Sequence, residues 1–200
     1  MDSKKYIEDI TQIKDMMKRS SRFLSLSGLS GILAGIYAVL GAVIAYFFLF
    51  PKPGEYLTLH SWNFKMTVVL LITIAILSIV TGYLLTIRKA KKNNEKIWDD
   101  TTRRLLFHFL VPLVTGGIFI LIKLNSQHYG LTASLMLIFY GIALLNASKY
   151  TLSNVQYLGL AQIVLGLICA ILPGYGFWFW VIGFGVFHIV YGSLIYFREG

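Results

Sequence analysis

Charged residues are scarce in this sequence, since only 14% of its 200 positions hold Asp, Glu, Lys or Arg. An average soluble domain carries about 25% charged residues and about 45–50% apolar ones. Here 56% of the residues are hydrophobic and the mean hydropathy is +0.69. The composition therefore excludes a soluble domain and predicts an integral membrane protein.

Cysteine is nearly absent as well, because Cys169 is the only one in the chain. A single cysteine allows neither an intrachain disulfide nor a zinc or iron–sulfur site built on cysteine ligands. No other group of residues has the spacing of metal ligands. We therefore expect no metal site and no bound cofactor.

The long apolar runs contain no acidic residue, because all nine Asp and Glu residues lie in the predicted loops and tails. Ion-coupled carriers usually place an ionisable group at membrane depth, and hydrolytic or divalent-metal sites usually pair carboxylates. The sequence also shows no nucleophile–base pair and no phosphate-binding loop. We expect a protein that is not an enzyme.

Six long apolar runs are present, and in lipid each must be helical so that its backbone polar groups are satisfied internally. The expected fold is all-α, with six transmembrane helices arranged as three helical hairpins in residues 23–200. An N-terminal amphipathic helix in residues 1–22 precedes them, and a charged loop is expected over 88–104. The predicted spans lie near 24–50, 64–87, 105–124, 131–148, 155–172 and 177–197.

The Lys and Arg residues are distributed unevenly over the predicted loops. Six spans place both termini on one side of the membrane, and 15 of the 18 basic residues fall on that side. The positive-inside rule then predicts that both termini are cytoplasmic. This topology and contact with anionic lipid headgroups account for the net charge of +9, and no nucleic-acid-binding motif is present. We expect a multi-pass membrane protein that does not bind nucleic acid.

The N-terminal segment carries a second pattern. Apolar residues recur at spacings of four, three and four, which places them on one narrow face of a helix opposite charged residues. This face is expected either to lie on the cytoplasmic leaflet or to dock against a cytoplasmic protein partner or a second copy of the chain. Its members are Tyr6, Ile10, Ile13 and Met17.

Small residues recur in the apolar runs at spacings typical of helix contacts. Gly116 and Gly141 are 25 residues apart, and Gly166 and Gly192 are 26 apart. This near-equal spacing suggests a two-helix unit that repeats in the same orientation. Small residues allow close helix packing, within one chain or in a homo-oligomer. The residues expected at such contacts are Ser27, Gly31, Gly35, Gly166, Gly185 and Gly192.

The last predicted hairpin has a glycine in its first helix, Gly166, and a proline–glycine turn at Pro173-Gly174. Its second helix has two spaced glycines, Gly185 and Gly192. This pattern over 165–197 resembles the short membrane repeat of the HdeD family of bacterial acid-resistance membrane proteins. The resemblance implies a six-helix protein of the bacterial inner membrane that is linked to stress or acid tolerance.

Four polar side chains fall within the predicted spans, all toward the cytoplasmic half. Gln162 shares a helical row with Gly166, and His188 shares one with Gly185, so both side chains suit hydrogen bonds across a helix contact. Alternatively, the four line a cavity, where histidines that change charge near neutral pH would form a pH sensor. The four residues are His108, Asn146, Gln162 and His188.

Aromatic residues gather at the ends of two predicted spans, from Tyr46 to Phe50 and from Tyr175 to Trp180, which predicts an external interfacial belt. Two functions remain open. The first is a non-enzymatic inner-membrane protein that acts in stress or acid adaptation through a cytoplasmic partner or lipid contact. The second is a small carrier or channel for a neutral or weakly acidic solute. Polar residues that face a central cavity would favour the second.

Overall fold

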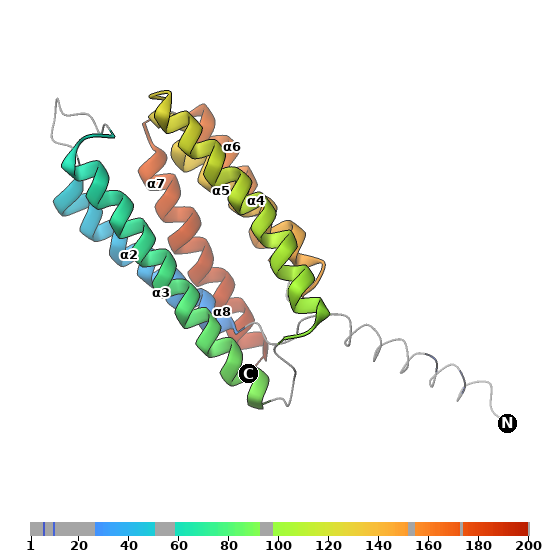
Figure 1. The fold of residues 1–200 in the computed structure, drawn as a ribbon. Coiled ribbons are helices and arrows are strands. Elements are labelled where there is room, and N and C mark those ends of the chain that lie inside the picture. The colour runs from blue at the N-terminus through green and yellow to red at the C-terminus, as the bar shows by residue number, and fades with distance from the viewer. Residues whose placement is uncertain are drawn as a thin grey trace.

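A computed structural model of the chain describes residues 6, 10, 27–50, 59–92, 98–151, 155–172 and 174–199. Each of the six apolar runs forms a helix there (Figure 1). The elements are α2 (Gly28–Ile44), η1 (Ala45–Leu49), α3 (Trp62–Lys92), α4 (Asp100–Asn125), η2 (Tyr129–Leu131), α5 (Thr132–Ser148), α6 (Val155–Ile171), α7 (Gly176–Trp180), η3 (Val181–Val186) and α8 (Phe187–Glu199).

Five of these helical segments are long and apolar enough to cross a membrane, which agrees with the prediction of a multi-pass membrane protein. They range from the 20 residues of Tyr129–Ser148 to the 31 residues of α3. About 20 residues suffice for the hydrocarbon core, since a helix rises about 1.5 Å per residue. The sixth helix, α6, is apolar but shorter, with 17 residues.

The prediction of a loop over 88–104 is wrong at both ends of that range. α3 continues to Lys92 and α4 begins at Asp100, so helix covers much of the charged segment. Lysines in the last turn of α3 interact favourably with the negative end of its helix dipole. Hydropathy predicts where a helix leaves the hydrocarbon, whereas the helix itself extends into the polar interface.

The start of α4 is fixed by a side-chain cap. The Asp99 carboxylate accepts hydrogen bonds from the Thr102 backbone N–H at 2.7 Å and from the Thr102 hydroxyl at 2.8 Å. We expect Asp99→Ala to lower the free energy of unfolding by about 1 kcal/mol, because it removes the side-chain acceptor that caps an N–H in the first turn of the helix. Asp99→Asn keeps an acceptor and should retain most of the stability in the same thermal unfolding assay. Equal stability of the wild type and Asp99→Ala would contradict this assignment.

The helices form two groups of three (Figure 1). In one group α2 packs against both α3 and the continuous helix formed by α7, η3 and α8, and in the other α5 packs against both α4 and α6. The first two pairs of consecutive helices therefore pack as hairpins. The last pair does not follow this pattern, because α6 packs mainly on α5 while α8 packs mainly on α2. The structure thus does not confirm an architecture of three stacked hairpins.

Glycine lets α2 and α8 approach until their backbones touch. A Cβ atom at Gly192 would lie 2.5 Å from the Ile32 nitrogen and 2.7 Å from the Gly28 oxygen. A Cβ at Gly35 would lie 2.6 Å from the Gly185 oxygen. A Cβ at Gly31 would lie 3.1 Å from the Gly192 Cα. Four of the small residues expected at helix contacts thus lie at this contact within the chain: Gly31, Gly35, Gly185 and Gly192.

The contact between α5 and α6 is built in the same way. A Cβ at Gly141 would lie 2.6 Å from the Gly159 oxygen, and one at Gly159 would lie 2.8 Å from the Gly141 oxygen. About two turns further along, the Ser134 hydroxyl donates a hydrogen bond to the Gly166 oxygen at 2.8 Å. Each group of three helices therefore contains one pair that packs closely at glycines.

Candidate functional site

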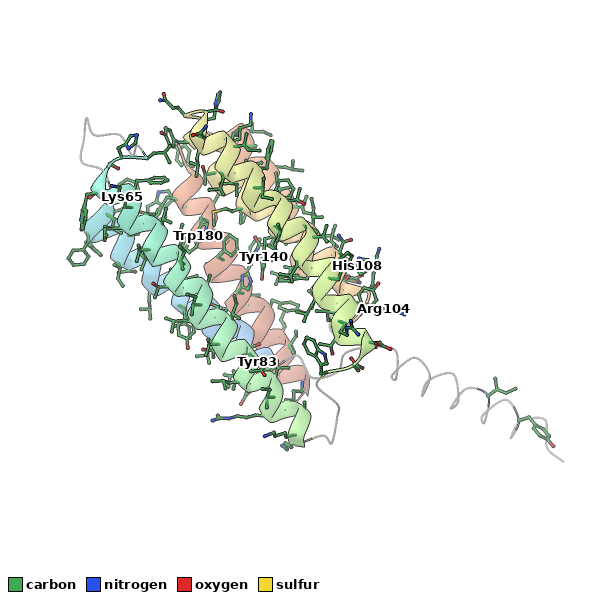
Figure 2. The ribbon with its side chains drawn as sticks, viewed as in Figure 1. Lys65, Tyr83, Arg104, His108, Tyr140 and Trp180 are labelled. Carbon is green, nitrogen blue, oxygen red and sulfur yellow. The ribbon has the colours of Figure 1, made fainter. Side chains whose placement is uncertain are left out.

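A cavity of about 550 Å³ lies between the two groups of helices. Side chains of α2, α3 and α8 line it from one group and side chains of α4, α5 and α6 from the other. Most of the lining is apolar. Figure 2 shows Tyr140 and Trp180 in this region, between α3 and α4. The polar side chains in the lining are Ser27, Ser30, Ser78, Tyr140, Thr151, Trp180, His188 and Tyr191.

A π-helical segment, η3, interrupts the last helix beside the cavity. Such segments are frequent at functional sites. The Gly183 carbonyl within it accepts two side-chain hydrogen bonds, one from Gln162 Nε2 at 2.8 Å and one from His188 Nδ1 at 3.0 Å. Gln162 is fully buried and His188 is 7% exposed. One backbone oxygen therefore joins α6 to the last helix and orients the imidazole.

The second imidazole nitrogen of His188 lies 2.7 Å from the Tyr140 hydroxyl. Because a carbonyl only accepts, Nδ1 must carry the proton that is donated to Gly183. In the neutral ring Nε2 is then the acceptor, and the Tyr140 hydroxyl donates to it. This bond connects α5 with α8, so the pair Tyr140–His188 links the two groups of helices at the wall of the cavity.

Aromatic rings complete this part of the wall. Phe184 contacts Tyr140, with 5.1 Å between ring centroids, and Trp180, with 5.3 Å. The Trp180 indole Nε1 and the Gln162 Oε1 are both buried without a hydrogen-bond partner among the described residues. Buried polar atoms normally have partners, so these two are unusual. The lining near His188 thus combines aromatic surface with one hydrogen-bond donor that has no partner among the described residues, the Trp180 Nε1–H.

The four polar residues singled out in the spans do not form one cluster. Gln162 and His188 come together at the Gly183 carbonyl. His108 is exposed on α4, where its ring stacks on Tyr150 at 5.2 Å between centroids, and Asn146 is half-buried on α5. Neither His108 nor Asn146 lines the cavity. Helical rows within single helices cannot show which faces of different helices meet.

Sequence reasoning missed the other members of the site. Tyr140 and Trp180 give no recognisable signal, because the chain contains 12 tyrosines and four tryptophans. Trp180 was expected in the external aromatic belt but lines the cavity. The rest of that cluster does gather at one end of the bundle, where Tyr46 contacts Phe177 at 6.2 Å and Trp178 at 5.9 Å between ring centroids.

The remaining candidate residues lie elsewhere. Ser27 is the N-cap residue of α2 and also lines the cavity. On the predicted amphipathic face Tyr6 and Ile10 are helical and exposed, while Ile13 and Met17 lie outside the described residues. Within the described part of the chain, no three His, Cys, Asp or Glu side chains are grouped so that they could hold a metal ion.

No family model, no curated protein and no solved structure matches this chain. The resemblance of residues 165–197 to the HdeD family therefore stays a prediction from the sequence. The function has to be argued from the cavity and its lining.

Proposed function

We propose that this chain is a small membrane carrier for a neutral or weakly acidic solute whose body is mainly apolar. The observation that carries this proposal is the cavity of about 550 Å³ between the two groups of helices. Ligand sites are typically cavities of about 300–1,000 Å³ with mostly apolar walls and a few polar groups that orient the ligand. The cavity has this volume and this lining.

The solute enters from the lipid, between α3 and α4. Ile79 on α3 and Leu106 on α4 both line the cavity, and they are 70% and 36% exposed. The cavity thus reaches the outer surface of the bundle, where the bilayer would surround it. An apolar molecule dissolved in the membrane can move through this opening without crossing water.

Filling the cavity tests the proposal. Ser78 is half-buried in the lining, and Ser78→Phe places an aromatic ring in the space that the solute occupies. We expect this variant to weaken saturable binding of tritiated oleyl alcohol by at least about tenfold. The measurement is a scintillation proximity assay on the purified chain in lipid nanodiscs.

Val80→Phe is the matched control, because Val80 lies on the same helix, is 49% exposed and does not line the cavity. Its binding should equal that of the wild type. Absence of saturable binding to the wild type, or equal loss in both variants, would contradict the proposal.

We further propose that all six apolar helices span the membrane, with both termini in the cytoplasm of a bacterial cell and the inner membrane as the location. The 17 residues of α6 reach about 25 Å along the helix axis, and spans can be as short as about 17 residues. The asymmetry of the basic residues supports the orientation. Cysteine accessibility labelling at Lys92→Cys and Lys123→Cys tests it, since the two positions should label from opposite sides.

The alternative function, action through a cytoplasmic partner or lipid contact in stress or acid adaptation, rests on the N-terminal amphipathic face and on the family resemblance. It stays a prediction from the sequence. The cavity favours the carrier, because an adaptor has no need of an intramembrane binding space with polar groups in its wall.

A further inference from the structure

The cavity-facing row of α3 continues toward the basic end of that helix. Four residues of α3 that line the cavity are Leu71, Ala75, Ser78 and Gly82. Their spacings of four, three and four define one row on the helix. The same spacing continues through Leu85 to Lys89 and Lys92. Lys89 and Lys92 lie seven and ten residues beyond Gly82, which is about 10 Å and about 15 Å along the axis.

The opposite wall of the opening also ends in basic residues. On α4, Leu105 and Leu106 line the cavity, and Arg103 and Arg104 directly precede them. Both arginines are exposed, and Figure 2 shows Arg104 at the end of α4 where that helix begins. Arg103 lies three residues before Leu106, which places the two on the same side of the helix. The basic ends of α3 and α4 thus lie at the same end of the bundle (Figure 1), beyond the cavity-lining residues Gly82 and Leu105.

Positive charge exceeds negative charge at these helix ends. Among the described residues they carry six basic side chains and two acidic ones, Asp99 and Asp100. The Asp99 carboxylate is already engaged, because it accepts two hydrogen bonds from Thr102. The basic residues are Arg88, Lys89, Lys91, Lys92, Arg103 and Arg104.

We propose that the solute is an anionic amphiphile, whose acyl chain occupies the cavity and whose headgroup binds between Arg103 and Lys92 at the basic end of the opening. This inference rests on the proposed carrier function and changes one part of it, because an anionic headgroup takes the place of a neutral or weakly acidic one while the apolar body stays the same. Basic pockets between transmembrane helices bind anionic lipid headgroups, and arginine pairs well with phosphate and carboxylate oxygens. The headgroup belongs to a membrane phospholipid or to a free single-chain amphiphile.

Competition against tritiated oleyl alcohol in detergent micelles tests this assignment. Oleyl phosphate is expected to bind about tenfold more tightly than oleyl alcohol, which has the same chain without the charge. Replacing both rim cations, Lys92→Gln with Arg103→Gln, should remove this preference and leave the binding of oleyl alcohol unchanged. The same competition is run with dioleoyl phosphatidylglycerol and with dioleoyl phosphatidylcholine. Stronger competition by phosphatidylglycerol would identify the solute as an anionic phospholipid, and no competition by either lipid would identify it as a single-chain amphiphile.

The matched control removes the same number of charges from exposed residues at the end of α3 that lie off the cavity-facing row. Arg88→Gln with Lys91→Gln should keep the preference for oleyl phosphate, since neither residue lies on the cavity-facing row. If both double variants lost the preference for oleyl phosphate equally, general attraction by surface charge would explain the preference, and the proposed headgroup site would be wrong. Equal affinity of oleyl phosphate and oleyl alcohol for the wild type would overturn it too, even where oleyl alcohol binds and the carrier proposal stands.

Discussion

Replacing Gly192 by alanine is expected to lower the free energy of unfolding by about 2–3 kcal/mol. The new Cβ would lie 2.5 Å from the Ile32 nitrogen and 2.7 Å from the Gly28 oxygen, which are both backbone atoms of α2. A flexible side chain could turn away from the methyl group, but these atoms move only if the two helices separate. Thermal or denaturant unfolding in detergent micelles measures the loss.

Two other glycines provide the control. Gly82 on α3 and Gly117 on α4 have no neighbouring atom within 4 Å of where a Cβ would be. Gly82→Ala and Gly117→Ala should therefore leave stability unchanged or raise it by up to about 1 kcal/mol, because alanine favours helix more than glycine does. A comparable loss of stability in all three variants would contradict this explanation, because it would show that the effect of Gly192→Ala does not come from the close contact between α2 and α8.

Replacing Tyr140 by phenylalanine is expected to cost about 1–2 kcal/mol of stability. The variant keeps the ring but removes the hydroxyl that donates to His188 Nε2 at 2.7 Å, and the nitrogen is left buried without a partner. His188→Leu removes both ring nitrogens, Nε2 and the Nδ1 that donates to the Gly183 carbonyl. This variant should therefore also lower the free energy of unfolding.

A double-mutant cycle isolates the bond itself. The variant with both Tyr140→Phe and His188→Leu should lose less stability than the sum of the two single variants, because the first change has no effect once His188 is gone. His108→Leu, at the exposed histidine of α4, should change stability by less than about 0.5 kcal/mol. Additive losses in the cycle would contradict a direct Tyr140–His188 bond.

The positions of the helices were largely predictable from the sequence. In lipid the backbone has to be helical wherever the side chains are apolar, so the six runs mark the helices to within a few residues in the hydrocarbon. The ends were not predictable in the same way. Hydropathy ends a span near 87, whereas α3 continues to Lys92 because lysines are good helix formers and complement the dipole at its end.

The site was predictable only in part. Gln162 and His188 stand out because polar side chains are rare in apolar runs, and both do lie at the contact around Gly183. Nothing in the order of residues shows that Tyr140 faces His188, since this depends on α8 packing against α2 rather than against α6. The π-helical segment is equally hidden, because it changes which residues of the last helix face the cavity without changing hydropathy.

The most direct test of the central claim maps where an apolar molecule binds. A diazirine-bearing analogue of oleyl alcohol is photolysed with the purified chain, and the labelled residues are identified by mass spectrometry. The cavity predicts labelling of Met136 and Phe184 that saturates and is competed by unlabelled oleyl alcohol. Labelling confined to outward residues such as Ile118 and Leu121, rising in proportion to probe concentration, would contradict a binding cavity between the two groups of helices.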